Sequence, residues 1–79
     1  MNAPIRSGVY ALHHGTRWIY VGEASDILAQ LIQHLHGDGV GITMFSGLTF
    51  SYELLSEVTR ARRQAELIQY FRPICNPLI

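Results

Sequence analysis

The chain has 79 residues, of which 48% are hydrophobic, and six basic residues balance six acidic ones, so the formal net charge is zero. This length allows one small domain, covering residues 1–79, and the hydrophobic content excludes a disordered chain. No apolar run approaches the roughly 20 residues that span a bilayer, and zero net charge argues against binding nucleic acid through bulk electrostatics alone.

The choice of charged and sulfur-containing residues is also informative. Cys75 is the only cysteine, which excludes an intrachain disulfide and a cysteine-based zinc site, and we expect a reducing cytoplasmic location. All six basic residues are arginines, whose planar fork of donors suits phosphate or carboxylate. Three of them fall within residues 60–63, which predicts either a solvated helix face or a phosphate contact.

Two short β-rich runs lie near the start of the chain. Residues 1–7 are expected to form a loose arm, and residues 8–12 and 17–21 are rich in the apolar and aromatic side chains that favour strands. A glycine-containing turn between the two runs predicts a β-hairpin.

The loop of this hairpin decides whether Tyr10 and Tyr20 share a face. A two-residue turn at His14 and Gly15 would place the tyrosines on opposite faces of the hairpin. A three-residue loop over residues 13–15, or a β-bulge, would place them on the same face. The sequence leaves both arrangements open.

A helical pattern follows the hairpin. Ser25 or Asp26 is expected to cap a helix that runs to about His36. Its apolar stripe consists of Ile27, Leu28, Leu31, Ile32 and Leu35. The same spacing puts His34 at the border between core and surface, and Gln30 lies one turn earlier on that edge.

The second half of the chain predicts one more strand and one more helix. Three glycines in residues 37–41 end the first helix, and residues 48–55 alternate as a third strand. Ser56 is expected to cap a helix over residues 57–71, which Pro73 ends before a fixed extended segment at 72–77. The buried stripe of this helix is expected to be Val58, Ala61, Ala65 and Ile68. The order β-β-α-β-α predicts an α+β domain, with a small, mainly antiparallel three-stranded sheet flanked by helices.

Several short motifs of the chain resemble the GIY-YIG nuclease family. The tripeptides Gly8-Val9-Tyr10 and Tyr20-Val21-Gly22 carry Val where the family usually has Ile, and a helical Glu66 is followed by Pro73 and Asn76. The resemblance covers residues 8–76. It implies a GIY-YIG-like domain that cuts DNA phosphodiester bonds with a single divalent ion, Mg²⁺ or Mn²⁺.

The resemblance also implies roles for individual residues. Glu66 would bind the metal, because a hard carboxylate oxygen suits Mg²⁺. Tyr10 or Tyr20 would activate the attacking water, and His34 would relay a proton or orient the phosphate. Asn76 resembles a supporting amide of the family that fixes the hairpin or the metal-bound waters.

One position departs from the family pattern. Gln30 stands where the helix arginine of the family is expected, and it carries no charge. That arginine stabilises negative charge on the phosphate, which is worth roughly 10³–10⁵ in rate in phosphoryl transfer. Arg62 and Arg63 remain candidates for phosphate contact.

Two functions are therefore open from the sequence. The first is a metal-dependent endonuclease acting on DNA, slowed by the missing arginine. The second is a catalytically lapsed module that binds nucleic acid or a protein partner, and a homodimer is also compatible with the sequence. No membrane partner is expected.

Overall fold

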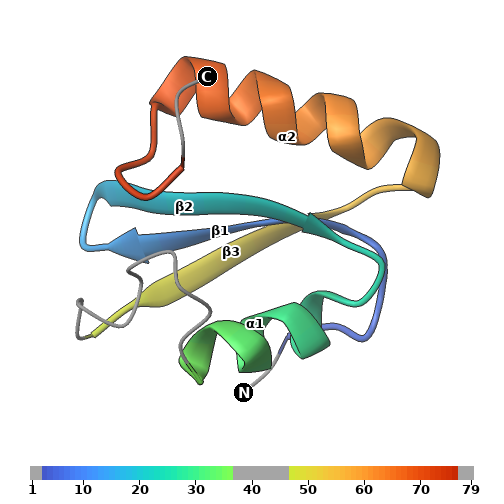
Figure 1. Cartoon of the computed structure of the whole chain (residues 1–79), viewed down its shortest axis with the longest axis horizontal. Coiled ribbons are helices and arrows are strands. Elements are labelled where there is room, and N and C mark those ends of the chain that lie inside the picture. The colour runs from blue at the N-terminus through green and yellow to red at the C-terminus, as the bar shows by residue number, and fades with distance from the viewer. Residues whose placement is uncertain (1–2, 37–46, 77–79) are drawn as a thin grey trace.

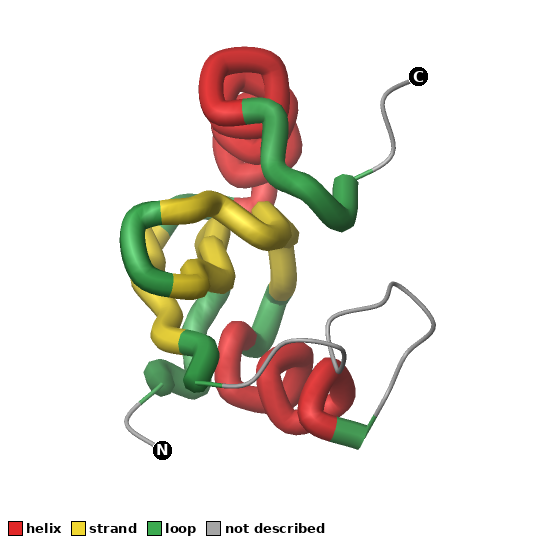
Figure 2. The backbone as a smooth tube through the Cα atoms, turned by 90° about the vertical axis from the view of Figure 1, so that its left-hand side faces the viewer, coloured by secondary structure: helices red, strands yellow, loops and turns green. Residues whose placement is uncertain are grey.

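The structure is a computed structural model that describes residues 3–36 and 47–76. Its elements are β1 (Gly8–His14), β2 (Arg17–Ala24), α1 (Ile27–Leu35), β3 (Thr49–Leu54) and α2 (Glu57–Phe71). Figures 1 and 2 show the sheet as a middle layer, with α2 on one side and α1 on the other. The predicted element order and α+β class are confirmed. The glycine-rich turn predicted at 37–41 lies outside the described residues.

The sheet has the strand order β2-β1-β3, and both strand pairs are antiparallel. The hairpin turns one residue later than either loop considered from the sequence, because β1 ends at His14 and Gly15 adopts a positive φ of 64°. The pairing of β1 with β2 is irregular between Leu12 and His13. As a result Tyr10 lies opposite Gly22, and Leu12 lies opposite Tyr20.

This β-bulge resolves the question that the sequence left open. Tyr10 and Leu12 are two residues apart on β1 and share a face, and Tyr20 is the partner of Leu12. Tyr10 and Tyr20 therefore share that face as well. Without the extra residue in β2, regular pairing from the same turn would have sent Tyr20 to the other side of the sheet.

The core between the sheet and α1 consists of Tyr10, Leu12, Ile19, Ala24, Ile27 and Leu31, all buried. Of the two expected caps, Ser25 and Asp26, it is Asp26 that caps α1, and its Oδ1 accepts a hydrogen bond from the Ala29 backbone N–H at 3.0 Å. The predicted border position of His34 is wrong: the side chain is only 4% exposed, whereas Ile32 is 44% exposed. The buried line of α1 runs through Ile27, Leu31 and His34, since a hydrogen-bonded imidazole can be buried.

The N-terminal segment is attached to the fold and is not a loose arm in its described part. The backbone N–H groups of Ile27 and Leu28 donate to the carbonyls of Arg6 and Pro4, at 3.1 and 3.0 Å. Leu55 N–H donates to the Ser7 carbonyl at 3.1 Å. The segment thus satisfies N–H groups in the first turn of α1 that have no partner within the helix.

Helix α2 has the predicted bounds, but the predicted buried stripe is wrong. Val58 is 88% exposed, Ala61 and Ala65 are exposed, and no residue of α2 is buried. Less exposed side chains on α2 include Arg60, Arg63, Gln64, Leu67 and Ile68. Long polar side chains cover this face of the sheet with their aliphatic stems and bond with their ends, so the apolar pattern alone pointed to the wrong side of the helix.

The segment after α2 protects the outer edge of β2. Arg72 ends the helix in the left-handed conformation, with φ 47°. Ile74 N–H then donates to the Trp18 carbonyl at 3.2 Å, and Cys75 N–H donates to the Ile19 carbonyl at 2.8 Å. These bonds occupy backbone groups of an edge strand that would otherwise be open to pairing. Neither described helix is long and apolar enough to cross a membrane.

Candidate functional site

Three side chains from three elements meet on the α1 side of the sheet. Tyr10 comes from β1, Tyr20 from β2 and His34 from α1. Tyr10 Oη and His34 Nε2 lie 2.6 Å apart and share a buried hydrogen bond. The ring centroids of Tyr10 and Tyr20 are 6.2 Å apart, and that of His34 is 5.0 Å from Tyr20. We call this group the tyrosine–histidine cluster.

Gly22 makes room for this cluster. The Tyr10 ring lies over Gly22, so that a Cβ at position 22 would collide with the Tyr10 hydroxyl and ring carbons. The last residue of the second tripeptide therefore has a packing reason to be glycine, because any side chain would displace Tyr10 from His34.

Two side-chain amides bond the backbone of Val21, the residue of β2 between Tyr20 and Gly22. Asn76 is buried; its Oδ1 accepts from the Val21 N–H at 2.8 Å, and its Nδ2 donates to the Val21 carbonyl at 2.9 Å. Gln64 Nε2 of α2 donates to the same carbonyl at 3.3 Å. Asn76, which the resemblance marked as a supporting amide, thus bonds the hairpin directly.

The remaining position on the α1 edge is Gln30. It lies one helical turn before His34 and is half-buried. Its amide is neutral, so position 30 adds hydrogen-bonding capacity beside the cluster but no positive charge.

The structure does not bring Glu66 to the cluster. Glu66 lies on α2, across the sheet from α1 and His34 (Figure 1). Its side chain is 58% exposed, and its Oε1 is 3.5 Å from Arg63 Nη1. Arg63 also donates through Nε to Glu53 Oε1 at 3.0 Å, and this hydrogen bond is the main cause that raises the Arg63 pKa. Arg62 is exposed on the same helix.

The divalent ion implied by the resemblance does not fit the donors of the cluster, which are phenols, an imidazole and neutral amides. The acidic side chains described here are placed elsewhere: Glu23 bonds Arg60 at 3.3 Å, Asp26 caps α1, Glu53 and Glu66 bond Arg63, and Glu57 lies in the first turn of α2. Residues 3–36 and 47–76 contain no group of three or more His, Cys, Asp or Glu side chains that could hold a metal ion.

Sequence reasoning missed two polar residues of α2 that face the sheet. Gln64 reaches the Val21 carbonyl, and Arg60 bonds both Glu23 and the hydroxyl of Ser7. Their shared spacing with Leu67 and Phe71, at intervals of three and four residues, was the available signal. It was overlooked because the expected stripe contained only apolar residues.

Comparison with known proteins gives one relative by sequence and several by structure. The chain is 34% identical over 82 residues to UvrABC system protein C of Aquifex aeolicus (strain VF5). The match covers 98% of this chain but only 14% of that protein. Comparison with models of protein families gives no match.

Solved structures that resemble the chain include several forms of one domain. One is the GIY-YIG N-terminal endonuclease domain of UvrC from Thermotoga maritima with bound magnesium; its TM-score is 0.83 at 22% identity, and the match covers 96% of this chain and 89% of that one. A point mutant of that domain, bound to its catalytic divalent cation, has a TM-score of 0.83 at 23% identity, and the match covers 98% and 89% of the two chains. At this level of identity the likeness shows the fold.

Proposed function

We propose that this chain, whose fold matches the GIY-YIG N-terminal endonuclease domain of UvrC, binds DNA with its tyrosine–histidine cluster and that hydrolysis there has lapsed. One observation supports the proposed loss of hydrolysis. Gln64 of α2 is neutral and donates to the Val21 carbonyl within the second tyrosine motif, whereas the nearest acidic residue along α2, Glu66, bonds Arg63.

The tyrosine–histidine cluster lacks the positive charge that catalysis would need. Cleavage of a phosphodiester builds negative charge on the phosphate, which nucleases offset with cations such as a metal ion or an arginine. Mg²⁺ is held through carboxylate oxygens, and the cluster offers phenols, an imidazole and amides. Gln30 can donate a hydrogen bond to a phosphate but cannot stabilise the developing charge as an arginine would.

Binding does not need that charge to the same degree. Tyrosine hydroxyls, glutamine amides and imidazoles all donate hydrogen bonds to phosphate oxygens in protein–DNA complexes. The relatives support DNA as the partner, since the T. maritima domain is an endonuclease domain of UvrC. The chain spans about a seventh of the length of the A. aeolicus protein, so the proposal concerns this domain alone.

A second candidate is the slow endonuclease, and the hydrogen bond between Tyr10 and His34 favours it. At 2.6 Å, the phenol can pass its proton to the imidazole and so become a base for water. In this alternative a divalent ion, Mg²⁺ or Mn²⁺, at Glu66 and a phosphate contact from Arg62 or Arg63 remain predictions.

Plasmid nicking and DNA binding separate the two candidates. The proteins compared are the wild type and Tyr10→Phe, each with supercoiled plasmid and Mn²⁺. We expect the wild type to raise the fluorescence anisotropy of a labelled duplex, which reports binding, and not to nick the plasmid. Wild-type nicking that Tyr10→Phe abolishes would establish the slow endonuclease. Absence of duplex binding would contradict both candidates and leave a protein partner as the better explanation.

A further inference from the structure

Strand β3 forms one edge of the sheet and is thinly covered. Within residues 3–36 and 47–76, its only strand partner is β1. The main contacts of α1 and α2 with the sheet are with β1 and β2. Every residue of β3 except Phe50 is exposed. In the described part of the chain, β3 is therefore open on both faces and along its outer edge.

The opposite edge of the sheet is protected. The carbonyls of Trp18 and Ile19 accept hydrogen bonds from the segment after α2, and Asn76 bonds both backbone groups of Val21. The sequence of β3 contains no proline, glycine or lysine, and its pairing with β1 keeps one register from end to end. Bulges, prolines, lysines and covering segments are the usual means of preventing an edge strand from pairing. An edge without them indicates a surface suited to strand addition.

The register of the sheet identifies the backbone groups of β3 that point outward. Leu55 N–H donates to the Ser7 carbonyl at 3.1 Å, so position 55 bonds toward β1. The bonding direction alternates from residue to residue in an antiparallel ladder. The N–H and C=O groups of Phe50, Tyr52 and Leu54 therefore point to the outer edge of β3.

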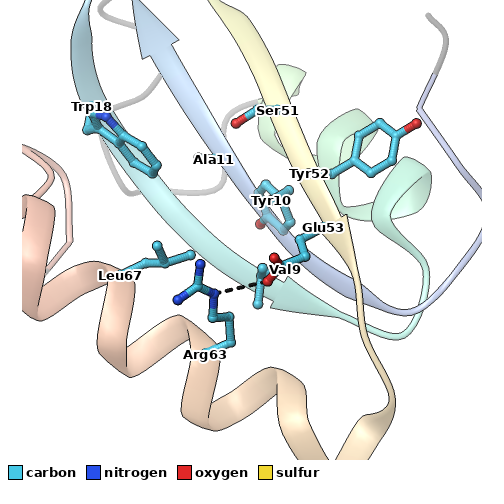
Figure 3. Close-up of a pocket in the computed structure, with 9 residues that line it drawn as sticks. All are labelled: Val9, Tyr10, Ala11, Trp18, Ser51, Tyr52, Glu53, Arg63 and Leu67. Carbon is cyan, nitrogen blue, oxygen red and sulfur yellow. Dashed lines mark hydrogen bonds and ion pairs between the residues drawn. The ribbon is translucent and has the colours of Figure 1, made fainter.

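The side chains of these three residues form an apolar row on the α1 side of the sheet. Tyr52 lies opposite Tyr10 on β1, so the row shares the face of the tyrosine–histidine cluster. The rings of Phe50 and Tyr52 are stacked, with centroids 6.3 Å apart. Tyr52 is 48% exposed and Leu54 is 40% exposed. Figure 3 shows Tyr52 pointing away from Arg63 on α2. The outer edge of β3 thus combines backbone donors and acceptors with exposed apolar side chains.

We propose that β3 pairs in antiparallel orientation with β3 of a second copy of this chain, in the register that places Tyr52 opposite Tyr52. The outward groups of both strands then coincide, and Phe50 of each copy lies opposite Leu54 of the other. The apolar row continues across the interface as cross-strand pairs. Glu53, the one charged residue of β3, lies opposite Ser51 of the second copy.

The pattern of β3 is what identifies a second copy as the occupant. A two-fold interface must be complementary to itself, and the apolar positions 50, 52 and 54 are symmetric about Tyr52. A shift of two residues in one direction would place the two Glu53 carboxylates opposite each other. The same shift in the other direction would carry Leu54 beyond the end of β3. The net charge of zero adds no long-range repulsion between two copies.

The pairing has a consequence for DNA binding, and this consequence alone rests on the function proposed above. Opposite residues of a ladder lie on the same face of the sheet, so both apolar rows and both α1 helices lie on one side of the combined sheet. The dimer then presents two tyrosine–histidine clusters to the same side. One duplex that contacts both clusters gains affinity, because the second contact forms within the complex.

Sedimentation equilibrium of the protein without DNA tests the pairing, since the mass of one copy is 8.9 kDa. We expect the wild-type mass to rise with concentration to twice that of one copy. Tyr52→Lys and Tyr52→Glu should each stay at the mass of one copy, because like charges would lie opposite each other at the centre of the interface. An equimolar mixture of the two variants should again reach twice the mass, because opposite charges then meet.

Tyr70→Lys is the matched control, since it adds the same charge on α2 at a residue that is 81% exposed. It should dimerise as the wild type does, and circular dichroism checks that each variant is folded. A wild type that keeps the mass of one copy at millimolar concentration would overturn the proposal. A dimer of folded Tyr52→Lys alone, or a mixture of the two variants that stays monomeric, would also overturn it. Because no DNA is present, failure of duplex binding by a dimeric wild type would contradict only the proposed function.

Discussion

Asn76 bonds both backbone groups of Val21: its Oδ1 accepts from the N–H at 2.8 Å, and its Nδ2 donates to the carbonyl at 2.9 Å. An amide side chain thus takes the place that a neighbouring strand would occupy at the edge of β2. Because Val21 lies between Tyr20 and Gly22, this contact fixes the strand that carries Tyr20 of the tyrosine–histidine cluster.

Replacing Asn76 should therefore destabilise the fold. Asn76→Ala removes both hydrogen bonds and leaves the buried Val21 N–H without its acceptor, which should cost roughly 1–3 kcal/mol in the free energy of unfolding. Urea denaturation followed by circular dichroism measures the change. Gln69→Ala, at an exposed position of α2, is the control and should change stability by less than about 0.5 kcal/mol. Equal stability of Asn76→Ala and wild type would show that the contact does not support the hairpin.

The hydrogen bond between Tyr10 and His34 should contribute to stability as well as to any chemistry. Tyr10→Phe keeps the ring but removes the hydroxyl, so the buried imidazole loses this partner at a cost of about 1–2 kcal/mol. Tyr52→Phe is the matched control, because Tyr52 is 48% exposed. Chemical denaturation of both variants tests the expectation. An equal effect of the two substitutions would contradict it.

The stability of the fold should fall in mild acid because of His13. Burial lowers the pKa of His13 below its usual value, so the unfolded chain takes up this proton more readily than the folded one. The contribution of neutral His13 to the free energy of unfolding is present above the ordinary histidine pKa of about 6.5. It is lost as the pH falls toward the lowered pKa of His13 in the folded protein. Denaturation at several pH values should show a smaller acid-induced loss for His13→Gln than for wild type. His14→Gln, on the exposed neighbour, should keep the wild-type loss.

Local patterns predicted most of the fold. Strand-forming runs around a turn signal, a capping Asp26 and a Pro73 after the second helix identify the elements, because each signal acts within a few residues. The shared face of Tyr10 and Tyr20 could be given only as one of two alternatives. A β-bulge depends on how the whole hairpin packs against α1, which spacing alone does not encode.

The candidate site was less predictable for a related reason. His34 was placed at a border by counting apolar residues, but the Tyr10 hydroxyl gives it a partner inside the core. Glu66 was selected because a helical Glu followed by Pro73 and Asn76 resembles the family pattern, without knowledge of which side of α2 meets the sheet. The structure turns Gln64 toward β2 and leaves Glu66 beside Arg63, and rotation of a helix about its axis follows from tertiary packing.

The orientation of α2 leads to a test that adds charge at the hairpin. Gln64→Glu replaces an amide that donates to the Val21 carbonyl with a carboxylate that cannot donate. Without metal, two oxygen groups then face one another, and the melting temperature should fall below that of the wild type. With Mn²⁺, the carboxylate and the carbonyl together supply oxygen ligands of the kind that hard cations prefer, so the melting temperature should rise again.

The control for this test is Gln69→Glu, which adds the same charge at an exposed position of α2. Its melting temperature should respond to Mn²⁺ no more than that of the wild type. Water proton relaxation by Mn²⁺ gives an independent measure of binding and should change for Gln64→Glu alone. If both glutamate variants respond equally, the effect is one of general charge, and position 64 is not a latent metal position. A response confined to Gln64→Glu would mean that the neutral amide of Gln64 prevents a divalent ion from binding beside Val21, between Tyr20 and Gly22.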